Sequence, residues 1–279
     1  MGFQCVQFAI GGTNKMVFLQ YALIGGVLAS IGCGIIGPFV VVRKIGYISG
    51  GIAHAVLAGM GIAFFLGKSP ILGALITALI AALIIGWVSL RSKKYEDTII
   101  SVLWASGMAI GIIFITKTPG YGVDLMSYLF GNILMITSRD IYLLAGLDVI
   151  VIILIILLYK QLLAVCFDEE FAKLRGLSVD FYFLLLLSMV ALTVVGLIQV
   201  VGLILVIALL TIPAAIASQY VNSVAKMILV AIVLGIIFIS VGLGISYQTN
   251  LPSGATIILF ASLAFLLATG LKKLIIRSG

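Results

Sequence analysis

The chain has 279 residues, of which 63% are hydrophobic and only 9% are charged, and its formal net charge is +7. This composition leaves too little polar surface to cover a water-soluble globule of that length, so it predicts a protein with several membrane spans. The basic residues stand singly or in small groups at the ends of apolar runs, which is typical of membrane orientation signals and argues against a nucleic-acid-binding surface.

Apolar runs of about 20 residues, the length of a helix that crosses the hydrocarbon core, recur along the whole chain. Barrel strands would alternate polar and apolar residues, and these runs do not. We therefore predict an all-α, polytopic fold in a single domain, residues 1–279. The nine predicted spans are Val17–Val42, Tyr47–Leu66, Ile71–Leu90, Thr98–Thr116, Ile141–Tyr159, Phe181–Ile198, Val200–Ser218, Lys226–Ile245 and Ala255–Leu271. Eight spans with one broken helix are the alternative, because only Gln199 and flanking glycines separate the sixth run from the seventh.

The distribution of Lys and Arg predicts an outside N-terminus and a cytoplasmic C-terminus, because loops rich in these residues stay in the cytoplasm. In that orientation only four of the 16 basic residues lie outside, namely Lys15, Lys68, Lys117 and Arg139.

The outer connection between the fourth and fifth spans begins with Pro119-Gly120-Tyr121-Gly122, which breaks a helix. An amphipathic segment from Asp124 to Gly131 follows, and it is too short to cross the membrane. We expect a short or re-entrant helix at about residues 124–136. Irregular backbone at membrane depth has to be buried in protein or line a cavity, so this segment is predicted to border a pathway.

The cytoplasmic connection 168–180 predicts a short helix, which Asp168 caps and Gly176 ends. Phe171 and Leu174 share one face, so the helix is shaped to insert into a groove of a cytoplasmic partner; a solvated loop on the membrane surface is the alternative. Its charges follow the helix dipole, with Glu169 and Glu170 in the first turn and Lys173 and Arg175 in the last.

His54 is the only histidine, and it lies within the second span. An ionisable side chain at membrane depth is by default a candidate functional residue. Gly50, Ala58 and Gly61 share its broad helix face and leave the imidazole unobstructed. A neutral imidazole is a good ligand for zinc, iron or manganese, so His54 either contacts a metal ion in a pathway or is a hydrogen-bonded packing residue.

Asp148 is the one carboxylate plainly within a span. We expect it to be a structural carboxyl in a wet outer vestibule, satisfied by water or a neighbouring hydroxyl. One Asp and one His on different helices do not form a convincing catalytic pair, and Gly67-Lys68-Ser69 lacks the preceding part of a phosphate-binding loop. The chain is therefore not predicted to be an enzyme, and any ATP hydrolysis belongs to another chain.

Six short blocks stand in order along most of the chain: Gly37–Arg43 leading into Ile48–Ala55, then Ser127–Leu134, Phe167–Ala172, Ile212–Ala215 and Leu251–Ala255. Together they resemble the permease subunits of ABC importers for manganese, zinc or iron. The resemblance implies a fold similar to the vitamin B12 permease and a multi-pass location in a prokaryotic cell membrane. It implies three partners: a second copy of the chain, a cytoplasmic ABC ATPase dimer, and an extracellular or periplasmic metal-binding protein.

The resemblance also implies that 168–180 is the coupling helix and that His54 lies in the translocation pathway. No permanently bound cofactor is expected, since the divalent metal is cargo and ATP binds the partner. Many members of the family carry Asp one turn before this histidine, where this chain has Gly50. Two copies would then offer a cation only two imidazoles, which leaves open whether the ion stops at a site or passes a constriction.

Two alternatives remain from the sequence. One is an ABC permease of the same architecture for a metal chelate or vitamin. The other is a gradient-driven secondary transporter with Asp148 and His54 as its proton relay.

Overall fold

The computed structural model describes residues 12–118, 131, 133 and 136–278, and every regular element in those residues is helical. Nine of the described helices are long and apolar enough to cross a membrane, which confirms the predicted all-α polytopic fold. They are α2 (Gly12–Arg43), α3 (Gly46–Phe65), α4 (Pro70–Arg91), α5 (Glu96–Thr116), α7 (Ser138–Phe167), α9 (Val179–Val201), α10 (Leu203–Tyr220), α11 (Val224–Thr249) and α12 (Ser253–Ser278). Two short elements connect them, η1 (Lys93–Tyr95) and α8 (Glu169–Leu174).

Gly202 separates the sixth span from the seventh. Its φ of 78° lies in the left-handed region, so α9 ends at Val201 and α10 starts at Leu203. The eight-span alternative is therefore wrong. Gly131 (φ 69°) packs against the carbonyl of Val201, too close for any side chain. The predicted outer helix 124–136 otherwise lies largely outside the described residues.

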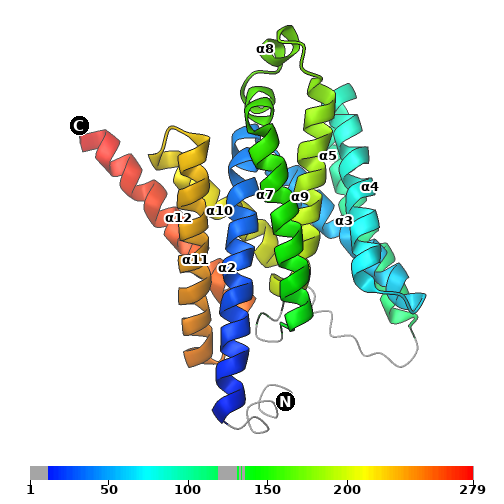
Figure 1. Ribbon diagram of the computed structural model, residues 1–279, viewed down its shortest axis with the longest axis vertical. Helices are drawn as coiled ribbons and strands as arrows, with labels where there is room; N and C mark the ends of the chain where they lie inside the picture. Colours follow the sequence, from blue (N-terminus) through cyan, green and yellow to red (C-terminus); the bar gives the residue numbers. More distant parts are fainter. Residues whose placement is uncertain (1–11, 119–130, 132, 134–135, 279) are drawn as a thin grey trace.

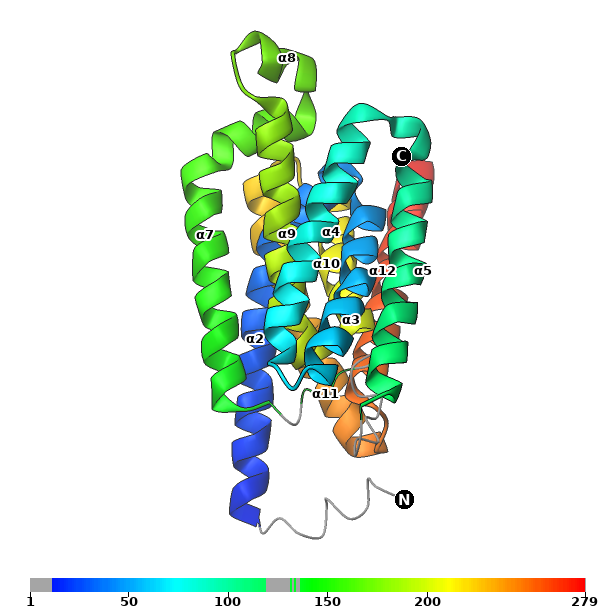
Figure 2. The same cartoon turned by 90° about the vertical axis from the view of Figure 1, so that its right-hand side faces the viewer.

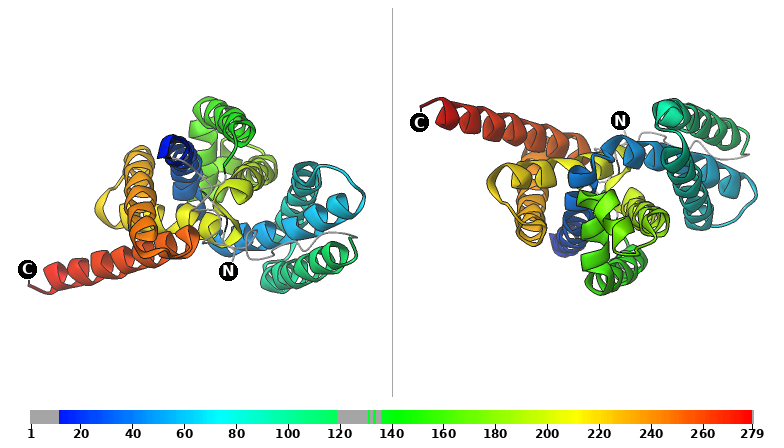
Figure 3. Two further views of the ribbon diagram at one scale, coloured as in Figure 1. Left: turned by 90° about the horizontal axis from the view of Figure 1, so that it is seen from below. Right: turned by 90° about the horizontal axis from the view of Figure 1, so that it is seen from above.

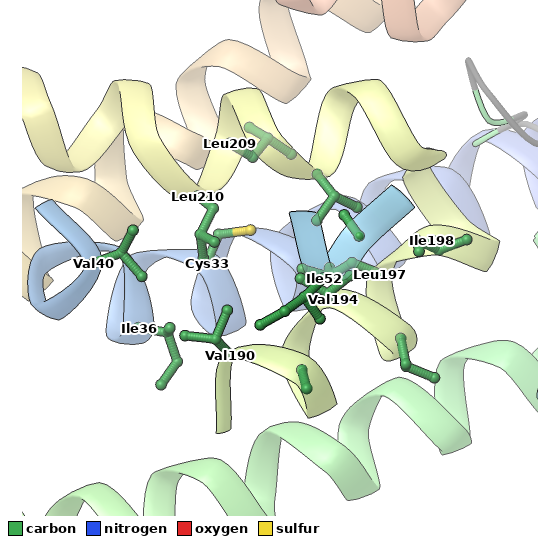
Figure 4. Close-up of a cluster of buried hydrophobic side chains, with 14 of the residues drawn as sticks. Cys33, Ile36, Val40, Ile52, Val190, Val194, Leu197, Ile198, Leu209 and Leu210 are labelled. Atoms are coloured by element: carbon green, nitrogen blue, oxygen red, sulfur yellow. The ribbon is translucent and has the colours of Figure 1, made fainter. Parts of the chain in front are cut away.

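The core lies where α2, α9 and α10 meet (Figure 4). Small residues let these helices approach closely. In a membrane, such close packing stabilises helix association, because the hydrophobic effect does not drive helices together in lipid. Gly37 of α2 packs directly on the Leu210 carbonyl of α10, where a Cβ would not fit. The buried side chains that fill the junction are Cys33, Ile36, Val40, Ile52, Val190, Val194, Leu197, Ile198, Leu209 and Leu210.

The two ends of the helix bundle differ. Helix α8 projects from the end at which α12 finishes, whereas α2 starts at the opposite end (Figures 1 and 2). Seen end-on, α12 and the group α3, α4 and α5 extend in opposite directions from the centre (Figure 3). Helix α3 is the most enclosed of the described spans: 83% of the residues in its apolar stretch are buried, against 22% in α5 and α12.

Candidate functional site

His54 lies in the first half of α3, where neighbouring helices come very close. Gly107 of α5 packs on the backbone of Ala55, and a Cβ there would lie 2.7 Å from Cα of Ala55 and 3.3 Å from the His54 carbonyl oxygen. On the other side, Gly59 packs directly against Gly73 of α4. The imidazole is therefore held on a helix that glycines fix on both sides, and its side chain is only 8% exposed.

The imidazole of His54 stacks on the indole of Trp104, a residue of α5. The two ring centroids are 4.0 Å apart, and the ring planes are inclined by 14°. Nδ1 of His54 is buried and has no hydrogen-bond partner among the described residues. The expectation of a hydrogen-bonded packing histidine is thus wrong for Nδ1. A buried nitrogen without a partner is costly, and it can serve as a ligand for a cation.

Gly50 lies beside the same indole. A Cβ at Gly50 would be 3.6 Å from Cζ3 of Trp104 and 3.9 Å from Cδ1 of Ile207 in α10, which are ordinary contacts. Tyr47, one turn earlier, shares a hydrogen bond of 2.7 Å with the Ser101 hydroxyl and so ties the start of α3 to α5. The structure therefore brings Gly50 and His54 together around Trp104, and a Cβ at Gly50 would fit there in ordinary contact. The expectation that the imidazole is unobstructed is wrong, because the Trp104 indole covers one of its faces.

The other two residues of the predicted face lie differently. Ala58 is partly buried. Gly61 packs against α5, where a Cβ would lie 2.5 Å from the Gly111 carbonyl oxygen. Gly61 thus allows α3 and α5 to pack closely, since no residue larger than glycine fits between their two backbones.

Asp148 is enclosed between α7, α2 and α9 and is only 4% exposed, so the expected wet vestibule is not found around it. A Cβ at Gly32 of α2 would lie only 2.5 Å from Oδ1 of Asp148, and the side chain of Thr193 in α9 is close to the same position. Oδ2 of Asp148 is buried without a hydrogen-bond partner among the described residues. Asp148 faces α2 and α9, whereas His54 faces α5, and no contact joins the two side chains in the described structure.

The predicted coupling segment contains a shorter helix than expected, α8 (Glu169–Leu174). The Asp168 carboxylate caps it by accepting a hydrogen bond of 2.9 Å from the Phe171 amide, and Gly176 follows with a φ of 77°. Ala172 is fully buried against Val165 and Val179, which anchors α8 on α7 and α9.

The opposite side of α8 is open. Leu174 is 88% exposed and Phe171 is 47% exposed, and the Arg175 guanidinium lies 5.0 Å from the centroid of the Phe171 ring. Glu170 and Lys173 are exposed on the same short helix, whereas Glu169 forms an ion pair with Arg43 at the end of α2. α8 thus presents apolar and charged groups together, the composition of a docking helix.

The described residues contain no group of three or more His, Cys, Asp or Glu side chains that could hold a metal ion. His54 can supply one ligand, so these residues form no closed metal cage within one protomer. Sequence reasoning missed Trp104 and the Arg43–Glu169 pair. Both are contacts between helices, and no local spacing reveals which helices are neighbours.

Comparison with known proteins agrees with this architecture. Residues 15–272 match the model of the ABC 3 transport family. An uncharacterized membrane protein of Synechocystis is 49% identical, covering 92% of this chain and 91% of its own length. The manganese import system permease protein ScaB of Streptococcus gordonii is 36% identical, with 94% of each chain covered. The structure of PsaBC from Streptococcus pneumoniae in complex with Fab is similar with a TM-score of 0.83 and 37% identity, covering 92% of each chain. The chain belongs to the ABC 3 transport family and has the helical membrane fold of its permeases.

Proposed function

We propose that this chain is the permease subunit of an ABC importer that moves a divalent transition metal ion, manganese, zinc or iron, into the cytoplasm. The observation that carries the proposal is His54, a buried imidazole at membrane depth whose Nδ1 has no hydrogen-bond partner within the part of the chain that the structure describes. Membership of the family and the manganese import function of a relative with 94% coverage support the same cargo class.

His54 lines the pathway, and Gly50, which has no side chain, lies one turn before it beside Trp104. A single neutral imidazole per protomer binds a cation weakly, because strong sites use several charged or strongly donating ligands. A second copy of the chain places its own histidine across the pathway. The cation is thus held for a short time and passes on, as transport requires binding that is weak enough to release.

The energy comes from a separate ATPase pair. ATP closes that pair, the segment 168–180 moves with it, and the spans rock around the pathway. The exposed Phe171 and Leu174 of α8 supply the apolar contact with the ATPase, and Glu170, Lys173 and Arg175 supply charges at its rim. An extracellular or periplasmic protein delivers the metal. The bundle end that carries α8 faces the cytoplasm, and the start of α2 faces outside.

Transport by the reconstituted complex tests the proposal. The chain, purified with its ATPase and metal-binding protein, is placed in liposomes, and ATP-dependent uptake of manganese, zinc and iron is compared. His54→Ala should lower metal uptake at least about tenfold, since truncating a ligand at a dry site removes the pathway's main polar contact. Ser49→Ala is the matched control, because Ser49 is a buried residue of α3 whose hydroxyl donates to the Gly46 carbonyl of its own helix.

Three outcomes would oppose the proposal. Uptake of a metal chelate in place of the free ions would point to a larger cargo. Uptake driven by an ion gradient without an ATPase would point to a secondary transporter. Normal uptake of all three metals by His54→Ala would remove that residue from the pathway.

A further inference from the structure

Arg43 lies at a tight corner between α2 and α3. Helix α2 ends at Arg43 and α3 begins at Gly46. The Lys44 amide donates to the Val41 carbonyl at 3.1 Å, and the Ile45 amide donates to the Val40 carbonyl at 3.0 Å. These two bonds and the φ of 60° at Lys44 form a closed helix end of the Schellman type. Because the turn is short and hydrogen-bonded, a displacement of the end of α2 moves the start of α3.

The same arginine reaches α8. Its guanidinium pairs with the carboxylate of Glu169, and it lies 5.3 Å from the ring centroid of Phe183 in α9. Among the side chains that the structure describes, this is the only ion pair. The other anchor of α8 is its packing on α7 and α9, the two helices that it joins. The Arg43–Glu169 pair therefore links α8 to a helix that is remote from it in the sequence.

His54 is at the far end of the same connection. It follows Gly46 by eight residues on one uninterrupted helix, so it lies about 12 Å along α3 from the corner. Glu169, Arg43, the corner and α3 thus form a continuous physical path from the docking helix to His54.

The ion pair adds little to stability. The side chain of Arg43 is 21% exposed and that of Glu169 is 29% exposed, and pairs with such access to water contribute little to the folding free energy. What the pair does add is a fixed register between α8 and the α2–α3 corner, because the Phe183 ring limits the positions that the guanidinium can take.

We propose that the Arg43–Glu169 pair passes the displacement of α8 to α3, and so sets how much metal moves for each ATP hydrolysed. The inference rests on the proposed function of the chain as an ABC importer permease. Both residues are positioning residues, since they act on the pathway through the α2–α3 corner.

The test measures two quantities in the same liposomes: ATP hydrolysis and manganese uptake by the chain with its ATPase and binding protein. Arg43→Gln and Glu169→Gln should leave ATP hydrolysis within about twofold of the wild type but lower the manganese moved per ATP by about fivefold to tenfold, a coupling of ordinary size for paired charges. The double variant should lose no more than either single variant, because both break the same link.

Arg91→Gln is the matched control. Arg91 also ends a span and lies 6.0 Å from the centroid of an aromatic ring, Trp87, but it forms no ion pair among the described side chains. It should keep the wild-type ratio of manganese to ATP.

The reversed pair, Arg43→Glu with Glu169→Arg, should recover a higher ratio of manganese to ATP than either reversal alone.

Any of three results would overturn the link. They are a wild-type ratio of manganese to ATP in either Gln variant, losses that multiply in the double variant, and a reversed pair whose ratio is no higher than that of either reversal alone. Failure of the proposed function is distinguishable, since the unmodified complex would then show no ATP-dependent metal uptake.

Discussion

The imidazole of His54 and the indole of Trp104 are stacked, with centroids 4.0 Å apart and planes inclined by 14°. One face of the histidine is therefore covered by an apolar ring from α5, and the orientation of its nitrogen atoms is restricted. A ligand that is held in one orientation loses less conformational freedom when a cation arrives. In the proposed function, the stack would hold His54 ready for a brief contact with the transported metal ion.

Replacing Trp104 with Leu should lower metal uptake by about threefold to tenfold, because an aromatic pair contributes about 0.5–1.5 kcal/mol beyond its buried area. Trp104→Phe keeps a ring beside His54 and should retain most of the uptake. The measurement is the rate of ATP-dependent uptake in liposomes across a range of metal concentrations. Equal rates in the Leu and Phe variants would show that the stack does not position the imidazole.

Replacing Gly50 with Asp should convert a passage into a binding site. A Cβ at this position makes only ordinary contacts, at 3.6 Å or more, and the carboxylate would lie one turn before His54. Carboxylate and imidazole together bind a divalent cation more strongly than imidazole alone. The variant should retain manganese after gel filtration and release it slowly during transport, whereas the wild type should retain none.

Gly50→Asn is the control, since it has the same size without the negative charge. If Gly50→Asn retained as much manganese as Gly50→Asp, the added negative charge would not be the cause of the retention. Absence of retention in both variants would place Gly50 away from the metal route.

Replacing Gly32 with Ala should destabilise the permease by roughly 1–3 kcal/mol, because a Cβ would be forced into a well-packed interior. It would lie 2.5 Å from Oδ1 of Asp148 and 3.6 Å from Cγ2 of Thr193. The thermal unfolding of the detergent-solubilised protein measures the change. Adding Asp148→Ala should recover part of the loss, and an unchanged melting temperature in Gly32→Ala would contradict the close contact.

Asp148→Asn should keep metal uptake within about twofold, because an amide of the same shape fills the enclosed site without a charge to bury. The carboxyl group does not contact His54 in the described structure, so it is not expected to relay protons to that residue. Uptake is measured with and without a pH gradient. Loss of a gradient-dependent component in Asp148→Asn would revive the secondary-transporter alternative.

Replacing Leu174 with Asp should reduce the amount of ATPase that co-purifies with the permease by at least about fivefold. The side chain is 88% exposed on α8, and in the proposed function it supplies apolar contact with the ATPase. Tyr95→Asp is the control, since Tyr95 is a 55% exposed aromatic side chain on a connection outside α8. Comparable loss in the two variants would indicate a general effect of added negative charge.

The sequence by itself determined the membrane class, the approximate limits of most spans, and the capped helix start at Asp168. These features follow from local properties: the length of apolar runs, the spacing of charges and the chemistry of a helix cap. The order of the six motif blocks also identified the family before any contact was known. The ambiguity at residues 194–210 remained, because Gly202 could interrupt a helix or separate two.

Only the tertiary structure decided which side chains meet. Trp104 is 50 positions after His54, and Glu169 lies on the opposite half of the chain from Arg43, so neither pair has a local signal. The enclosure of Asp148 likewise depends on Gly32 and Thr193 of two other helices. In a membrane, an apolar helix face can lie against lipid or against another helix, so hydropathy does not predict which face packs on protein. Close contact between small residues and between complementary side chains determines which helices pack together.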